Sequence, residues 1–179
     1  MRTILVIFGT RPEAIKLAPV IRVLKQYPQE FETRVCVTGQ HREMLDQVLR
    51  LFAVEPDIDL EIMRDGQSLF DVTIATLRGL EGVLGSERPD WVVVQGDTTT
   101  TMAASLASFY AGIPVAHVEA GLRTGRMDAP RPEEMNRRVA SVLADLHFAP
   151  TPRAVENLLR EGVAAERIHL TGNTVMYLV

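Results

Sequence analysis

Carboxylate side chains stand where apolar runs of this sequence end. Asp97 and Glu119 each follow a strongly apolar, strand-like run, and Glu133 and Glu134 open a later helical pattern. A carboxylate placed beside a weakly acidic C–H group or a leaving group can take up or deliver a proton. The pattern therefore predicts acid–base chemistry, provided that the fold brings these groups together.

Basic and amide side chains accompany the carboxylates. Arg11 and Lys16 follow the first apolar run, and Gln40 and His41 follow the second. Cationic side chains and the N-termini of helices can hold phosphate groups. The combination suits an anionic substrate that is altered by proton transfer, and a sugar nucleotide is such a substrate.

Structural roles compete with these functional ones. Asp97 precedes four threonines, so a turn or a helix cap explains it as well as catalysis does. Glu133 is spaced to form an ion pair with Arg137 one helical turn later, and each basic residue, taken alone, could simply be solvated. Glu119 differs because it stands where a buried strand should reach the surface, and this position favours a functional role.

The histidines and the one cysteine are mostly explained by packing. Cys36 lies within an apolar run and is expected in the core, and His117 is expected to be a hydrogen-bonded structural residue. His147 and His169 are expected within strands. His41 stays open between an acid–base group and a structural histidine.

Alternating strands and helices must position these groups. Apolar runs predict strands over 3–8, 33–38, 91–94, 114–118, 147–149 and 167–170, and helical spacing predicts helices from Arg11 onward and over 44–52, 68–84, 98–109, 132–146 and 152–161. Pro19 falls inside the first helix and predicts a bend near Ala18. Repeated strand–helix units with apolar strands predict an α/β fold, a doubly wound parallel sheet with helices on both faces. In such sheets the ligand lies outside the carboxyl ends of the strands.

The composition excludes several classes of protein. The chain has 179 residues, 46% hydrophobic and 23% charged, as is typical of one globular domain. A net charge of −4, without basic residues interleaved with aromatic ones, argues against nucleic-acid binding. No apolar stretch approaches the roughly 20 residues needed to cross a bilayer, and the first apolar run is too short for a signal peptide. A cytoplasmic protein without a membrane partner is therefore expected.

Common cofactor and metal motifs are missing from the sequence. One cysteine can form neither a disulfide framework nor a cysteine-based metal site, and it fits a reducing compartment. No two glycines are spaced as in G-x-G, no glycine is followed by lysine, and H-E-x-x-H, C-x-x-C and G-x-S-x-G do not occur. We therefore expect no metal and no redox cofactor.

Taken together and in this order, the motifs resemble those of the non-hydrolysing UDP-N-acetylglucosamine 2-epimerases. The segments that carry the resemblance are FGTRPEAIKLAPVI (8–21), VTGQHREMLDQVL (37–49), QGDTTTTMAASLA (95–107), HVEAGLRTG (117–125), PEEMNRR (132–138) and TGNTVM (171–176). Each is a weak signal alone, whereas the ordered set is highly specific.

The resemblance implies an isomerase that interconverts UDP-N-acetylglucosamine and UDP-N-acetylmannosamine without a redox cofactor, for the synthesis of cell-surface polysaccharides. It implies elimination of UDP to a 2-acetamidoglucal, followed by return of UDP with a proton delivered to the opposite face of C2. By motif match, Asp97, Glu119 and Glu133 are the catalytic carboxylates, with no division into base and acid, and Arg11 and Lys16 lie near the substrate.

The resemblance also bears on regulation. In some bacterial members a second substrate molecule binds beside the active site, and Gln40 and His41 match the segment that holds it. Glu43 and Gly66 stand where some regulated members have glutamine and arginine, which argues against such regulation here.

Members of the family have two similar α/β domains in the glycosyltransferase-B architecture and are commonly homodimers. Residues 1–179 match the amino-terminal domain. The C-terminal nucleotide-binding domain, with most of the uridine and diphosphate contacts and a catalytic histidine, is absent from this chain, which we therefore expect to fold but to be inactive alone. The alternatives are a non-catalytic nucleotide-sugar-binding or interaction module, a hydrolysing 2-epimerase and a UDP-diacetamido-sugar epimerase.

Overall fold

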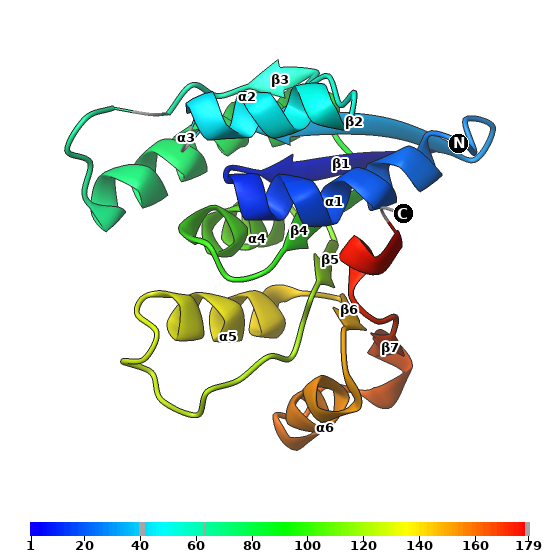
Figure 1. The fold of residues 1–179 in the computed structure, drawn as a ribbon, viewed down its shortest axis with the longest axis vertical. Helices are drawn as coiled ribbons and strands as arrows, with labels where there is room; N and C mark the ends of the chain where they lie inside the picture. The colour runs from blue at the N-terminus through cyan, green and yellow to red at the C-terminus, as the bar shows by residue number, and fades with distance from the viewer. Residues whose placement is uncertain (40–41, 63, 178–179) are drawn as a thin grey trace.

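A parallel sheet organises the chain. The computed structural model describes residues 1–39, 42–62 and 64–177, and in these residues seven strands follow the order β3-β2-β1-β4-β5-β6-β7 (Figure 1). Every neighbouring pair is parallel. The strands are β1 (Arg2–Phe8), β2 (Phe31–Val37), β3 (Ile58–Asp59), β4 (Trp91–Gln95), β5 (Val115–Val118), β6 (Leu146–Ala149) and β7 (Ile168–Leu170). The helices are α1 (Arg11–Leu24), α2 (Arg42–Leu51), α3 (Leu69–Glu87), α4 (Thr99–Tyr110), α5 (Glu133–Leu143) and α6 (Pro152–Arg160), with two 3-10 turns, η1 (Ala165–Arg167) and η2 (Thr174–Tyr177).

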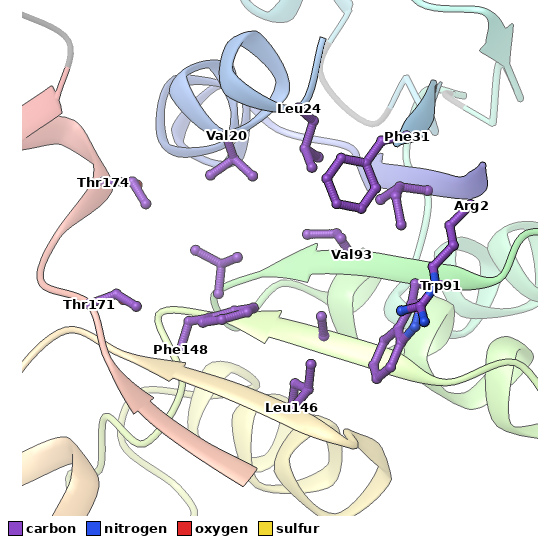
Figure 2. A pocket seen from close by; sticks show the side chains of 13 residues that line it. Arg2, Val20, Leu24, Phe31, Trp91, Val93, Leu146, Phe148, Thr171 and Thr174 are labelled. Atoms are coloured by element: carbon purple, nitrogen blue, oxygen red, sulfur yellow. The ribbon is translucent and has the colours of Figure 1, made fainter. Parts of the chain in front are cut away.

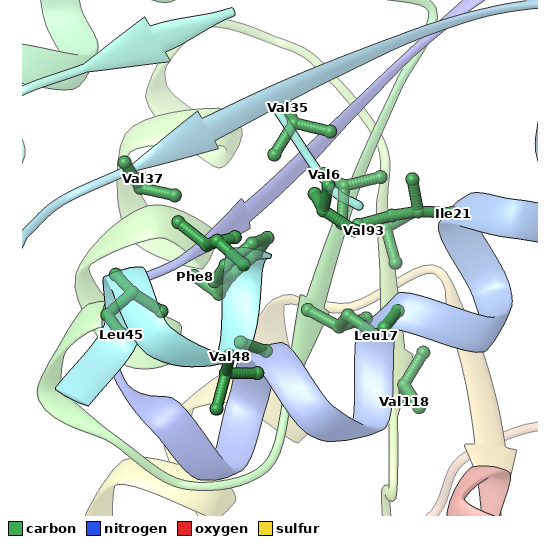
Figure 3. Close-up of a cluster of buried hydrophobic side chains, with 14 of the residues drawn as sticks. Val6, Phe8, Leu17, Ile21, Val35, Val37, Leu45, Val48, Val93 and Val118 are labelled. Atoms are coloured by element: carbon green, nitrogen blue, oxygen red, sulfur yellow. The ribbon is translucent and has the colours of Figure 1, made fainter. Parts of the chain in front are cut away.

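Helices cover both faces of this sheet. Successive residues of a strand point to opposite faces, and both faces of the central strands are apolar. Val6, Phe8 and Val35 belong to a core cluster with residues of α1 and α2 (Figure 3). Leu5 and Val92 belong to a second cluster, with residues of α3 and α4, on the other face. This arrangement confirms the predicted α/β fold with a doubly wound parallel sheet.

The end of α5 differs from the prediction. The helix stops at Leu143 rather than continuing to Leu146, which instead begins β6. Asp145 leaves the helix because it pairs with Val115: its N–H donates to the Val115 carbonyl at 2.8 Å, and its carboxylate accepts the Val115 N–H at 3.1 Å. A contact 30 residues away in sequence therefore ends a helix whose apolar pattern continues.

Two further features concern α1 and β3. Helix α1 has Pro12 in its first turn, as predicted, and continues through Pro19 without a break; the bend expected near Ala18 stays a prediction. The two-residue strand β3 was not predicted, because so short a segment has no periodic pattern. Among the described residues, no helix combines the length and apolar character required to cross a membrane.

Candidate active site

The carboxyl ends of β1, β4 and β5 lie side by side at one edge of the sheet. β4 pairs with β1 on one side and with β5 on the other, and all three strands are parallel. Helix α1 presents Lys16 here, β4 ends at Gln95 with Asp97 two residues beyond it, and Glu119 directly follows β5. The fold thus brings together groups that the sequence analysis placed at separate strand ends.

Glu119 is held from two sides. The Lys16 ammonium forms an ion pair with Glu119 Oε1, and the Gln95 side-chain amide donates to Glu119 Oε2. The side chains of Lys16 and Glu119 keep 25% and 17% of their accessible surface, so solvent or a ligand can still reach the pair. A carboxylate fixed in this way is oriented but not enclosed, as proton exchange with a bound molecule requires.

The backbone of Glu119 is unusual as well. Its φ is +64°, a left-handed conformation that costs a residue with a side chain about 1 to 2 kcal/mol. Such strain at a non-glycine residue is found preferentially in functional sites, where the surroundings enforce it. The conformation therefore supports the functional role predicted for Glu119.

Asp97 lies in the same cluster and is paired with α5. Arg137 forms an ion pair with Asp97 Oδ2, and the Asn136 side-chain amide donates to the Asp97 carbonyl at 3.0 Å. Burial raises the pKa of Asp97 above its usual range; the Arg137 charge opposes this shift, whereas the charges of Glu119 and Glu133 add to it. Helix α4 is capped by Thr98, not Asp97, so the helix-cap explanation of Asp97 is wrong.

The two glutamates that open α5 differ in environment. Glu134 is buried and accepts the backbone N–H groups of Thr124 and Gly125 at 3.0 and 3.3 Å, so it fixes the loop after β5. Glu133 is only partly buried and acts on Asp97 through its charge. The ion pair that helical spacing allows between Glu133 and Arg137 does not form, because the Arg137 guanidinium lies against Asp97, with Glu134 at 3.8 Å.

The remaining predicted site residues are not seen in contact with the carboxylates in the described part of the chain. Arg11 is exposed at the start of α1 and, within the described part of the chain, forms no ion pair. Gln40 and His41 lie outside the described residues.

His117 is buried and structural, as predicted: its Nε2 donates to the Gly96 carbonyl at 2.7 Å, and burial is the main reason that its pKa falls to about 4. Cys36 is buried in the core, as predicted.

Sequence reasoning missed several residues that shape the site. Gln95 was placed directly after a predicted strand, and Asn136 and Arg137 in a predicted helix, without a role in the site, although all three contact Asp97 or Glu119. Glu13 is buried, and its carboxylate accepts the N–H groups of Gly9 and Thr10. Position at a strand end was an available signal for Gln95, whereas no sequence signal indicates the tertiary partner of Arg137.

The cluster can perform acid–base chemistry beside a charged ligand. Asp97, Glu119 and Glu133 provide carboxylates, and Lys16 and Arg137 provide positive charge beside them. Positively charged side chains at this solvent-accessible edge can hold an anionic group while a neighbouring carboxylate exchanges a proton. Among the residues that the structure describes, no group of three or more histidine, cysteine or acidic side chains is arranged to hold a metal ion.

A separate apolar groove lies on the α1 side of the sheet (Figure 2). Its volume is about 460 Å³, and its walls come from α1, from β1, β2, β4, β5 and β6, and from the segment with Thr171 and Thr174. Leu24, Phe31 and Phe148 line it. None of its lining residues is acidic, so the groove does not supply the carboxylates of the candidate active site.

Comparison with known sequences identifies related proteins over almost the whole chain. A family model described as UDP-N-acetylglucosamine 2-epimerase matches residues 23–178. UDP-N-acetylglucosamine 2-epimerase of Yersinia pestis is 60% identical over 173 residues, which are 97% of this chain and 46% of that protein. The chain thus spans about half the length of the curated relatives it matches.

Comparison with solved structures agrees with this relationship. The crystal structure of UDP-GlcNAc 2-epimerase from Neisseria meningitidis bound to UDP-GlcNAc is 54% identical, with a TM-score of 0.92 over 97% of this chain and 47% of that one. A lipopolysaccharide outer core galactosyltransferase is 14% identical with a TM-score of 0.68 over 97% of this chain and 46% of that one, and it is similar in fold alone.

Proposed function

Because the chain belongs to the UDP-N-acetylglucosamine 2-epimerase family, we propose that it forms the amino-terminal half of an enzyme that interconverts UDP-N-acetylglucosamine and UDP-N-acetylmannosamine. The observation that carries the proposal is the grouping of Lys16, Glu119 and Asp97 at the carboxyl ends of adjacent strands. The relative from Neisseria meningitidis, whose structure holds UDP-GlcNAc, supports the substrate.

We propose that the carboxylates perform the proton transfers at C2. One takes the C2 proton as the bond from C1 to the UDP oxygen breaks; the C2–H electrons form the C1–C2 double bond of a 2-acetamidoglucal, and UDP leaves with the electrons of the C1–O bond. A proton then returns to the opposite face of C2 as UDP reattaches. Asp97, Glu119 and Glu133 are the carboxylates for these steps, and Arg11 and Lys16 offset negative charge at the substrate.

We further propose that a second α/β domain follows in the complete protein and holds most of the nucleotide, as in a glycosyltransferase-B architecture. The relatives' greater length supports this proposal. The apolar groove supports it too, because most of its lining side chains are apolar and a segment of the second half could cover them. A segment of the second half that covered this groove would bury Phe31 and Phe148 further.

The working form that we propose is a homodimer in the cytoplasm. Exposed apolar side chains on α3 and α4, among them Phe70, Ile74 and Tyr110, support association with another protein surface. The unpaired thiol of Cys36 is compatible with a reducing compartment.

Proton NMR in D2O tests the proposal. UDP-N-acetylglucosamine is incubated with the 179-residue chain and, separately, with the complete protein that contains it. We expect UDP-N-acetylmannosamine and deuterium at C2 only with the complete protein. Free N-acetylmannosamine would instead indicate a hydrolysing enzyme, and exchange by the 179-residue chain alone would contradict the half-site. Binding without turnover by the complete protein would indicate a non-catalytic module.

A further inference from the structure

We propose that Glu13 is a positioning residue that ties the loop after β1 to the start of α4 and thereby sets where Lys16 and Asp97 stand. The inference rests on the proposed function, because the positions of these two groups matter only if they act on a substrate. Glu13 is 1% exposed, so it does not contact the ligand itself.

One oxygen of the Glu13 carboxylate fixes the loop after β1. Oε2 accepts the backbone N–H groups of Gly9 at 3.0 Å and Thr10 at 2.7 Å. These two N–H groups lie in the turn between β1 and α1, and in many parallel sheets the N–H groups of this turn bind a phosphate. Here the Glu13 carboxylate accepts their hydrogen bonds instead, so the turn is held without a ligand.

The other oxygen contacts α4. The Thr98 hydroxyl donates to Oε1 at 2.7 Å, and the Thr101 hydroxyl lies 3.1 Å from the same atom. Thr98 is the N-cap of α4, since its hydroxyl oxygen accepts the Thr101 N–H at 3.0 Å. Glu13 therefore joins segments that are 85 residues apart in sequence.

The residues that Glu13 contacts are adjacent, in sequence or through a hydrogen bond, to residues of the candidate active site. Lys16 lies three residues after Glu13, on the same side of α1. Thr98 directly follows Asp97. The Thr101 hydroxyl donates to the Gln95 carbonyl at 2.6 Å, and the Gln95 side chain contacts Glu119.

A capping box explains why a glutamate stands at the third position of α1, since Glu13 accepts the N–H of the N-cap residue Thr10. It does not explain why the other oxygen of Glu13 is hydrogen-bonded to α4. A buried carboxylate is expensive unless every lone pair is hydrogen-bonded, and an apolar side chain would serve a core at lower cost. What the carboxylate adds is a fixed distance between the start of α1, which carries Lys16, and the segment after β4, which carries Asp97. A shift of about 1 Å in such groups can reduce turnover about 100-fold.

The test compares Glu13→Ala and Glu13→Gln in the complete protein, with Glu30→Gln, at an exposed residue, as a matched control. We expect Glu13→Ala to reduce kcat per folded molecule about 100-fold with KM changed less than about threefold. Glu13→Gln keeps the shape and one acceptor oxygen, so it should recover at least about tenfold of that loss. Its pH profile should match that of the wild type, because Glu13 exchanges no proton with the substrate.

A second measurement does not depend on activity. Backbone amide resonances of the 179-residue chain are compared between the wild type and Glu13→Gln, which is the variant more certain to fold. We expect shifts at Gly9 and Thr10 that extend to Gln95, Asp97 and Glu119. Shifts confined to the loop after β1, or a kcat equal to that of the wild type in folded Glu13→Ala, would overturn the proposal, as would a changed pH profile. A failure of the proposed function would be visible separately, as an inactive wild type.

Discussion

The ammonium group of Lys16 and the carboxylate of Glu119 form an ion pair although 103 residues separate them in sequence. Lys16 lies on the helix after β1, and Glu119 follows β5. β4 stands between these strands, so the two side chains meet beside its carboxyl end, where Gln95 donates to Glu119. The parallel sheet, rather than local sequence, creates this contact.

Replacement of Glu119 by glutamine tests its part in the reaction. Glu119→Gln keeps the size of the side chain but removes its ability to take up a proton, so turnover in the complete protein should fall at least about 100-fold. Far-UV circular dichroism should remain close to that of the wild type, because glutamine keeps the shape of the side chain and an oxygen that can accept the Gln95 amide. Turnover at the wild-type rate would contradict the role of Glu119.

The strands and the strand-end carboxylates could be predicted because both depend on short apolar runs. Asp97 and Glu119 follow such runs directly, so their places at the sheet edge follow once the strands are parallel. Their partners could not be predicted. Arg137 is equally well spaced for Glu133 by helical geometry, yet it pairs with Asp97 because the packing of α5 brings the two together.

Replacement of Gly121 by any residue with a side chain is predicted to destabilise the fold for steric reasons. Its φ is +87°, and a Cβ there would lie 2.3 Å from the carbonyl oxygen of Ala154 in α6. Gly125 is a matched control, since its φ is +80° but a Cβ would meet no atom within 4 Å. Gly125→Ala should cost about 1 kcal/mol of unfolding free energy from the backbone conformation alone, and Gly121→Ala about 2 kcal/mol more. Urea denaturation measures both, and equal losses would refute the steric argument.

The thiol of Cys36 is predicted to be unreactive in the folded chain. It is fully buried in β2, and burial is the main cause that raises its pKa to about 12, with the charges of Asp59 and Glu87 adding to the shift. Because the thiolate is the reactive form, a disulfide reagent at pH 8 should label the native chain at least about 100-fold more slowly than the chain in 6 M guanidinium chloride. Rapid labelling without denaturant would show that β2 opens readily.

The buried imidazole of His117 should make the fold sensitive to acid. Burial is the largest cause that lowers its pKa to about 4, and the hydrogen bond to the Gly96 carbonyl only partly offsets that effect. The unfolded chain has the ordinary value of 6.5 and so binds a proton more readily than the folded chain does. The neutral His117 imidazole therefore makes its full contribution to the free energy of unfolding above pH 6.5. This contribution is lost progressively as the pH falls towards 4, by up to about 3 kcal/mol. Burial also lowers the pKa of His147, which contributes in the same direction.

His117→Gln isolates this contribution, because an amide can donate to the Gly96 carbonyl without titrating. Urea denaturation of both proteins between pH 7.5 and 4.5 should show the wild type losing stability more steeply, so the free-energy difference between the two narrows as the pH falls. His147 remains in both proteins and cancels from the comparison. Parallel pH curves would mean that His117 binds its proton equally well in the folded and unfolded chains, and would contradict its burial as a neutral group.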